Sequence, residues 1–237
     1  MKQKKKTSLS IGGAAAREAR LRAVVDESQI ISTKSYNLIM GLTVAYGLLV
    51  NLLICKFVGN AYAIINPILL IIGYVVLAFA GCFIARKSNN PVISFLGYNM
   101  VVIPMGMLLS TVVYFYGGIG SGIVMMAFAD TLAITVLMIA GSMLFPQFFS
   151  KLGGILFVGL IGILLCGFIS IFFHTDGMAL SVIAAAVFSL YIGYDFWRSQ
   201  QFPKTVDNAI DCALDIYVDI INLFIRLLEI LSKANNR

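Results

Sequence analysis

The chain has 237 residues, of which 60% are hydrophobic and 12% are charged, and its mean hydropathy is +0.95. Soluble domains carry about 25% charged residues, so this composition excludes a soluble globular protein. The net charge of +6 does not indicate nucleic-acid binding, because the sequence has no basic stripe with interleaved aromatic residues. The apolar residues form continuous blocks long enough to cross a bilayer as helices, which predicts an all-α membrane protein.

Residues 1–35 are polar and basic, and we expect them to form a cytoplasmic tail in which AAAREARLRAVV is a short helix-forming stretch. Residues 36–237 are expected to form a single transmembrane helical domain. Pro104 falls inside the third apolar segment of this domain and predicts a kink there. The seven apolar segments are 36–58, 62–85, 91–116, 119–145, 152–173, 177–197 and 209–231.

Basic residues between the segments predict the orientation, because lysine and arginine resist translocation across the membrane. With the lysine-rich N-terminus in the cytoplasm, the outer connections carry only Lys56. The sequence therefore predicts a multi-pass membrane protein with a cytoplasmic N-terminus. The segment 209–231 either crosses the membrane or re-enters it, and the basic residues after it do not decide between the two. The basic residues of the inner connections are Arg86, Lys87, Lys151, Arg198 and Lys204.

An enzyme has little support in this sequence. Ser121 in GGIGSG and His174, the only histidine, would both lie at the outer face, but Ser121 lacks the glycine two residues before it that a G-x-S-G serine protease motif needs. A zinc protease of the H-E-x-x-H type needs two histidines. We therefore expect no enzymatic activity and no cofactor.

Acidic residues inside the apolar segments are stronger functional candidates, because an intramembrane carboxylate must face a partner, a cavity or an ion path. Between residues 36 and 194 the acids are Asp130, in MMAFADTLAIT, and Asp176, in a loop. Asp130 is either a functional residue or bonded locally to a serine, a threonine or the backbone of a neighbouring helix.

Asp195 in VFSLYIGYDFW and Asp219 in LDIYVDIINLF form the sharper candidate site, because a short polar hairpin makes their segments antiparallel neighbours. Two carboxyl groups close together in a low dielectric cannot both ionise cheaply, so such a pair shares a proton. With the proton bound, the pair holds the two helices together. Without it, the helices repel or attract a cation, and calcium suits carboxylate oxygens.

Helix depth leaves the partner of Asp195 open at this point. At about 1.5 Å per residue, Asp195 lies ~3 Å from the end of its segment, whereas Asp219 lies ~15 Å into the next. By depth, Asp211 or Asp215 would be the better partner, unless residues 207–214 project into the cytoplasm. In that case Asp207 and Asp211 are expected to be solvated at the inner mouth.

The stretch FSLYIGYDFW, followed by ALDIYVDIINLFIRLLEIL, resembles the closing signature of the Bax inhibitor family, and its bacterial members in particular. Weaker similarity extends to FIARKSNNPVISFLGY and MAFADT, so the resemblance covers most of residues 36–231. The resemblance implies a seven-helix transmembrane bundle in which the other six helices wrap a central C-terminal helix.

The same resemblance implies a function and assigns residues to it. Bacterial members conduct a pH-sensitive calcium leak, in which Asp195 and Asp219 would be the gating pair and proton sensor and Arg86, in FIAR, the latch that bonds the first of them. Calcium would be the permeant ion or bind at these two aspartates, and the bacterial plasma membrane would be the location. Asp215 and Asp130 depart from the family pattern. Asp215 would either favour the protonated form of Asp219 or act as an additional cation ligand.

Two other classes of function stay open. One is a membrane interaction protein that regulates stress or cell-death signalling through membrane-protein partners, without conductance of its own, as the eukaryotic relatives suggest. The other is a proton-coupled transporter of an organic solute, against which the absence of an evident inverted repeat counts.

Overall fold

The computed structural model describes residues 27–88, 90–173 and 177–235, and within these ranges it contains helices and no strands. The predicted all-α class is therefore confirmed. Of three short helical turns, η1 (Glu27–Gln29) precedes the first long helix, and η2 (Ala61–Ala63) and α6 (Pro146–Ser150) lie between long helices. The long helices are α2 (Thr33–Phe57), α3 (Pro67–Lys87), α4 (Pro91–Phe115), α5 (Gly122–Leu144), α7 (Gly153–Phe173), α8 (Met178–Ser199) and α9 (Val206–Asn235).

The helix ends follow the local sequence. The helix α3 begins five residues later than predicted, because Pro67 occupies its first turn and the Asn66 side chain accepts hydrogen bonds from the amides of Ile68 and Leu69. Ser32 caps α2 in the same way. The expected tail helix at 14–25 lies outside the described residues.

In the described part of the chain, six helices are long and apolar enough to cross a membrane, namely α2, α3, α4, α5, α7 and α8. Large apolar side chains on their outer faces are exposed, such as Phe79 at 75% and Val158 at 70%. Exposed apolar surface of this extent needs lipid around it. The protein is therefore an integral, multi-pass membrane protein, as predicted.

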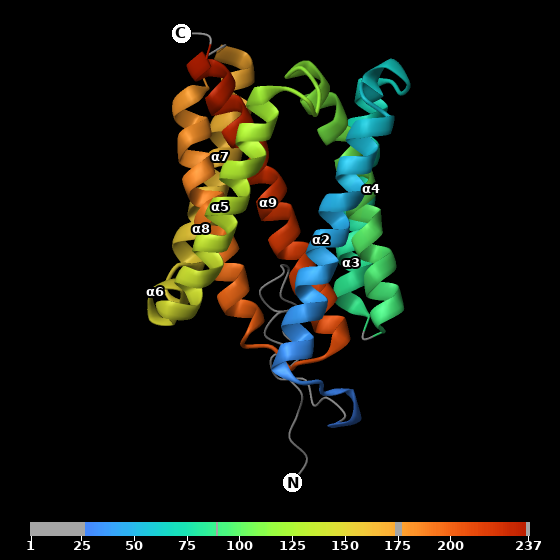
Figure 1. Ribbon diagram of the computed structural model, residues 1–237, viewed down its shortest axis with the longest axis vertical. Helices are drawn as coiled ribbons and strands as arrows, with labels where there is room; N and C mark the ends of the chain where they lie inside the picture. The colour runs from blue at the N-terminus through green and yellow to red at the C-terminus, as the bar shows by residue number, and fades with distance from the viewer. Residues whose placement is uncertain (1–26, 89, 174–176, 236–237) are drawn as a thin grey trace.

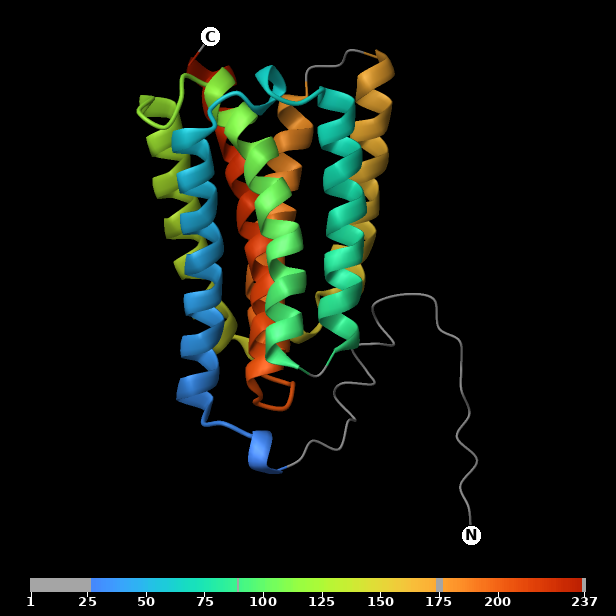
Figure 2. The same cartoon turned by 90° about the vertical axis from the view of Figure 1, so that its right-hand side faces the viewer.

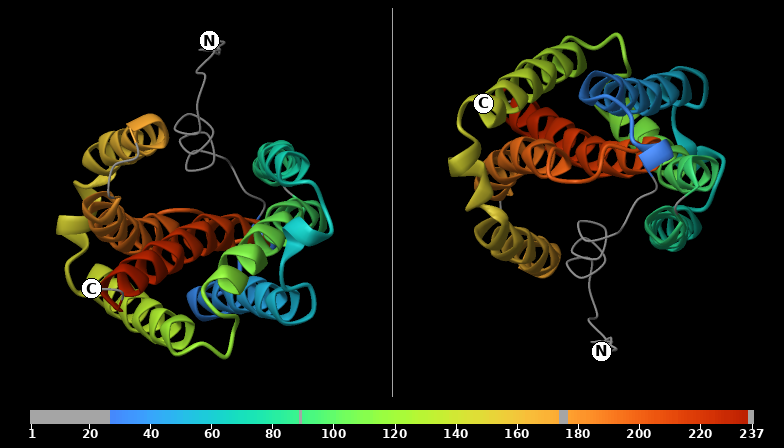
Figure 3. Two further views of the ribbon diagram at one scale, coloured as in Figure 1. Left: turned by 90° about the horizontal axis from the view of Figure 1, so that it is seen from above. Right: turned by 90° about the horizontal axis from the view of Figure 1, so that it is seen from below.

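The amphipathic helix α9 occupies the centre of the bundle. It packs against α2 and α4 on one flank and against α5 and α8 on the other. The main contacts of α3 are with α4, and those of α7 are with α8, so α3 and α7 lie further out. Viewed along the bundle, α9 runs diagonally between a group formed by α2, α3 and α4 and a group formed by α5, α7 and α8 (Figure 3).

The course of α9 shows that the last segment crosses the bundle from one end to the other and does not re-enter. This helix is continuous from Val206 to Asn235, and its C-terminal end lies at the end of the bundle opposite to the start of α2 (Figures 1 and 2). Its residues contribute to both large hydrophobic clusters of the core, Ile216 to one and Tyr217 to the other. The predicted central C-terminal helix is therefore confirmed.

Glycine allows α3 and α4 to come into backbone contact. A Cβ atom on Gly97 would lie 2.6 Å from the carbonyl oxygen of Gly81 and 2.9 Å from the backbone nitrogen of Ala85. A Cβ on Gly81 would meet the carbonyl oxygen of Gly97 at 2.5 Å. Neither position has room for a larger residue unless the helices separate.

Candidate functional site

A chain of ion pairs crosses the bundle from α3 through α9 to α8. The Nη2 atom of Arg86 on α3 donates to Oδ1 of Asp215 at 2.7 Å, and Nη2 of Arg198 on α8 donates to Oδ2 of the same carboxylate at 2.6 Å. Nη1 of Arg198 also lies 2.9 Å from Oδ1 of Asp195, one helical turn earlier on α8. Asp215 thus links helices of both groups to the central helix.

The predicted pair of Asp195 and Asp219 is brought together at one end of this chain. The two carboxyl groups lie close enough to share a proton, and each residue is at most 7% exposed. Arg198 and Asp215 also lie close enough to Asp219 to interact with it electrostatically. Residues 86, 195, 198, 215 and 219 are called the acid–arginine network below.

The network differs from the expected latch in two ways. The carboxylate that pairs with Arg86 is that of Asp215 on α9, whereas the resemblance implied Asp195. The sequence pattern predicts Arg198 only as a basic residue of an inner connection, whereas in the structure it pairs with two of the acids. Its spacing of three residues from Asp195 is the signal that could have placed both side chains on one face of α8.

The expectation that Asp207 and Asp211 are solvated is wrong. Asp207 is 5% exposed and Asp211 is 7% exposed, so neither is solvated. The Oγ atom of Ser94 on α4 donates to Oδ1 of Asp207 at 2.5 Å and holds the first turn of α9 inside the bundle. The diagonal course of α9 then brings Asp219 to Asp195, although the two lie at different distances from the ends of their helices (Figure 1).

The charges of the network do not cancel when every group is ionised. Three carboxyl groups, on Asp195, Asp215 and Asp219, face two guanidinium groups, which leaves one negative charge in excess. One bound proton or one monovalent cation would neutralise the network. Three other titratable side chains interact with its members, those of Cys212 on α9, Cys82 on α3 and Tyr194 on α8, and Asp211 on α9 interacts with Cys82 and Cys212.

The structure offers fewer carboxylate oxygens for calcium coordination than the sequence suggested. Over the residues that the structure describes, no three histidine, cysteine or acidic side chains gather in a way that could hold a metal ion. Because Arg198 and Arg86 already occupy oxygens of Asp195 and Asp215, a cation would have to displace a guanidinium group to reach several carboxylates at once.

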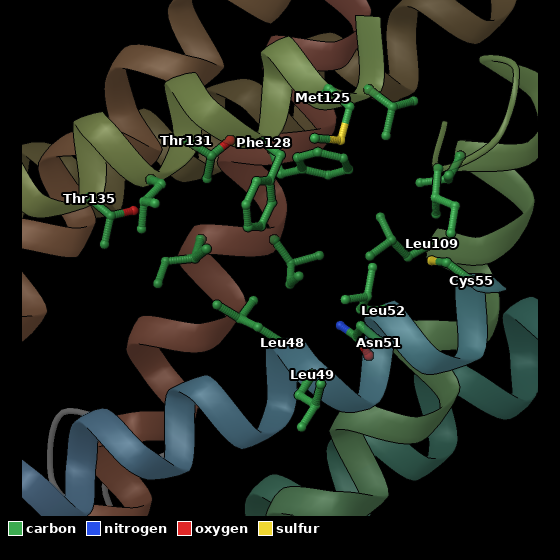
Figure 4. Close-up of a pocket in the computed structure, with 17 residues that line it drawn as sticks. Leu48, Leu49, Asn51, Leu52, Cys55, Leu109, Met125, Phe128, Thr131 and Thr135 are labelled. Carbon is green, nitrogen blue, oxygen red and sulfur yellow. The ribbon is translucent and has the colours of Figure 1, made fainter. Parts of the chain in front are cut away.

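A hollow of about 400 Å³ lies between α2, α5 and α9, away from the acids (Figure 4). At 100° per residue, Ile221 and Phe224, which line it, lie on roughly the opposite side of α9 from Asp215. Side chains of α2 and α5 face each other across the hollow. Its lining is apolar except for Asn51, Thr131 and Thr135.

The remaining sequence candidates lie apart from the network. Asp130 is exposed on α5, and it makes no hydrogen bond or ion pair with any residue that the structure describes, so the local bond considered above is not formed. Ser121 precedes the first turn of α5. His174 and Asp176 lie outside the described residues.

Fold and network together define a polytopic membrane protein whose central helix carries acids that are buried among arginines. A family model described as inhibitor of apoptosis-promoting Bax1 matches residues 28–236. The chain belongs to this family, the Bax inhibitor family, as its closing motif indicated.

Individual relatives match over shorter stretches. Protein lifeguard 4 of Mus musculus is 32% identical over 117 residues, which are 48% of this chain and 49% of the relative. The Golgi anti-apoptotic protein of vaccinia virus (strain Lister) is 33% identical over 131 residues, 54% of each chain. An uncharacterized protein of Campylobacter jejuni is 33% identical over 115 residues, 46% of this chain and 49% of the relative. The chain thus spans about half the length of these relatives.

Proposed function

We propose that the protein is a pH-sensitive calcium leak channel, with the acid–arginine network as its proton sensor and gate. In this proposal the N-terminus is cytoplasmic, the membrane is a bacterial plasma membrane, and calcium is the permeant ion. The observation that carries the proposal is the pair of neighbouring carboxyl groups of Asp195 and Asp219, buried at the contact of α8 and α9.

Proton binding would close the channel through charge balance. With one proton bound, the network is neutral, and its ion pairs tie α3 and α8 to the central helix. Loss of the proton leaves one excess negative charge in a low dielectric, which weakens the contact of α8 with α9 and attracts a cation. Calcium flux should therefore be low at acidic pH and rise as the pH increases.

The hollow between α2 and α5 lies on the side of α9 that faces away from Asp215, and it supports the proposal that the channel is closed in this structure. In this proposal the hollow lies on the ion path, and its apolar lining excludes water and ions until its walls move apart. Its α9 wall, which includes Ile221 and Phe224, belongs to the same helix as Asp219. A shift of α9 after proton loss would therefore change the hollow as well as the network.

Calcium flux into dye-filled liposomes, measured over a series of pH values, tests the proposal. The wild-type protein is expected to conduct more calcium as the pH rises. The double variant Asp195→Asn with Asp219→Asn has no proton to lose at this pair, so its flux should not change with pH. Asp130→Asn is the matched control, because it neutralises an acid of a transmembrane helix outside the network, and its flux should follow the wild type.

Two results would overturn the proposal. One is a double variant, with wild-type helicity and the same size in detergent, that keeps both the flux and its pH response. The other is a wild-type protein that conducts no calcium at any pH in liposomes. Protein-free liposomes give the background for both comparisons.

A second candidate function is regulation of other membrane proteins without conductance. The names of two relatives, a Golgi anti-apoptotic protein and lifeguard 4, favour it. This candidate predicts the absence of flux from the purified protein, so the liposome experiment also separates the two functions.

A further inference from the structure

Asp130 places a carboxyl group on the lipid-facing side of a transmembrane helix. It lies eight residues after Gly122, the first residue of α5, and therefore about 12 Å along this helix from its N-terminal end. The residue is exposed, and so are its neighbours one turn before and two turns after, Met126 at 57% and Leu137 at 67%. The carboxyl group therefore faces the hydrocarbon region of the bilayer.

This exposure is costly and sets Asp130 apart from the acids of the network. An aspartate in the middle of a transmembrane helix raises the free energy of insertion, and such residues almost always face a partner or a cavity. Asp195 and Asp219 are buried at the contact of two helices. Asp130 has no hydrogen bond or ion pair within residues 27–88, 90–173 and 177–235.

The partner has to supply a cation or a hydrogen-bond donor at the depth of Asp130. A second copy of this chain is poorly suited, because the exposed lysines of its described helices lie at their ends, as Lys34 and Lys56 of α2 and Lys87 of α3 do. Two copies related by a twofold axis through α5 would bring one carboxyl group against another. The small side chains of Ala129 and Ala133, both exposed beside Asp130, allow a neighbouring helix to approach closely.

We infer that the outward face of α5 around Asp130 binds a transmembrane helix of another membrane protein, and that this helix presents a lysine or arginine to the Asp130 carboxylate. The two opposite charges then neutralise each other inside the bilayer. This interaction is independent of the network, whose residues lie on α3, α8 and α9, and it requires no calcium flux.

Energy transfer in liposomes provides the test, with a dye at the C-terminus of the full chain and a second dye on a synthetic transmembrane peptide. The peptide is about 20 leucines long and carries one central lysine, and the comparison peptide has leucine in that place. Wild-type protein is expected to bind the lysine peptide about tenfold more tightly than the leucine peptide. Asp130→Asn should abolish this preference, and Asp130→Glu should retain it.

The variants change an exposed side chain, so folding is preserved, and wild-type helicity and wild-type size in detergent would verify it for both variants. Equal binding of the two peptides by the wild type would overturn the inference. An unchanged preference in Asp130→Asn would do the same. Self-association of the protein in the absence of peptide, if it disappears in Asp130→Asn, would assign the face to a second copy and also contradict the inference.

Discussion

Replacing Asp215 with asparagine is expected to lower the free energy of unfolding by about 3 kcal/mol, because it breaks two largely buried ion pairs that share this carboxylate. Each oxygen of this carboxylate serves a different arginine, Arg86 or Arg198. Asparagine has one acceptor oxygen, and its amide nitrogen would face the second guanidinium group. Arg86 is one-third exposed and can reach water, which places the loss at the lower end of the range for buried pairs.

Unfolding by denaturant in mixed micelles measures this effect, and Glu229→Gln is the matched control. Glu229 also accepts from two cations, Arg226 and Lys233, both at 3.2 Å and both on α9. These pairs join residues of one helix and are more exposed, so their loss should cost less than about 1 kcal/mol. Similar losses in the two variants would contradict the role of Asp215 as a link between helices.

Gly97→Ala is expected to lower the free energy of unfolding by about 2 kcal/mol, because its methyl group has no space at the contact of α3 with α4. The obstructing atoms are the backbone atoms of Gly81 and Ala85, which cannot rotate away as a long side chain can. The helices must separate by several tenths of an ångström, and the packing around them is lost over more than one turn.

Gly73→Ala is the control for this prediction, because the same change is made in α3 where no atom lies within 4 Å of the new Cβ. Alanine is the better helix former by about 0.5–1 kcal/mol, so this variant should be as stable as the wild type or more stable. In the same unfolding assay, the free energy of unfolding is thus expected to fall in Gly97→Ala and to stay the same or rise in Gly73→Ala. A neutral Gly97→Ala would show that the two helices are not in contact at this point.

The sequence predicts most of the fold, because a helix that crosses the bilayer needs a continuous apolar segment of about 20 residues. Six apolar segments became helices within a few residues of their predicted bounds. The late start of α3 at Pro67 and the short helix α6 were not predicted, because local capping and turns decide them rather than hydropathy.

The candidate site could be predicted only in part. The motif identified Asp195 and Asp219, and the structure brings them together. Depth counting failed because it treats helices as parallel to the membrane normal, whereas α9 crosses the bundle diagonally. The burial of Asp207 depends on Ser94, a residue 113 positions away in the sequence, and no local pattern indicates such a contact. The bridging role of Asp215 depends in the same way on Arg86 of α3.

The central position of α9 also has a consequence for biosynthesis. The two groups of three helices leave the ribosome before α9 does, yet each depends on α9 for part of its interior packing. Neither half can reach its final packing before α9 has been synthesised, and their inner faces stay open to lipid or to chaperones until this helix enters between them. Assembly of the two halves in the membrane therefore waits for one helix, which completes the packing of both at once.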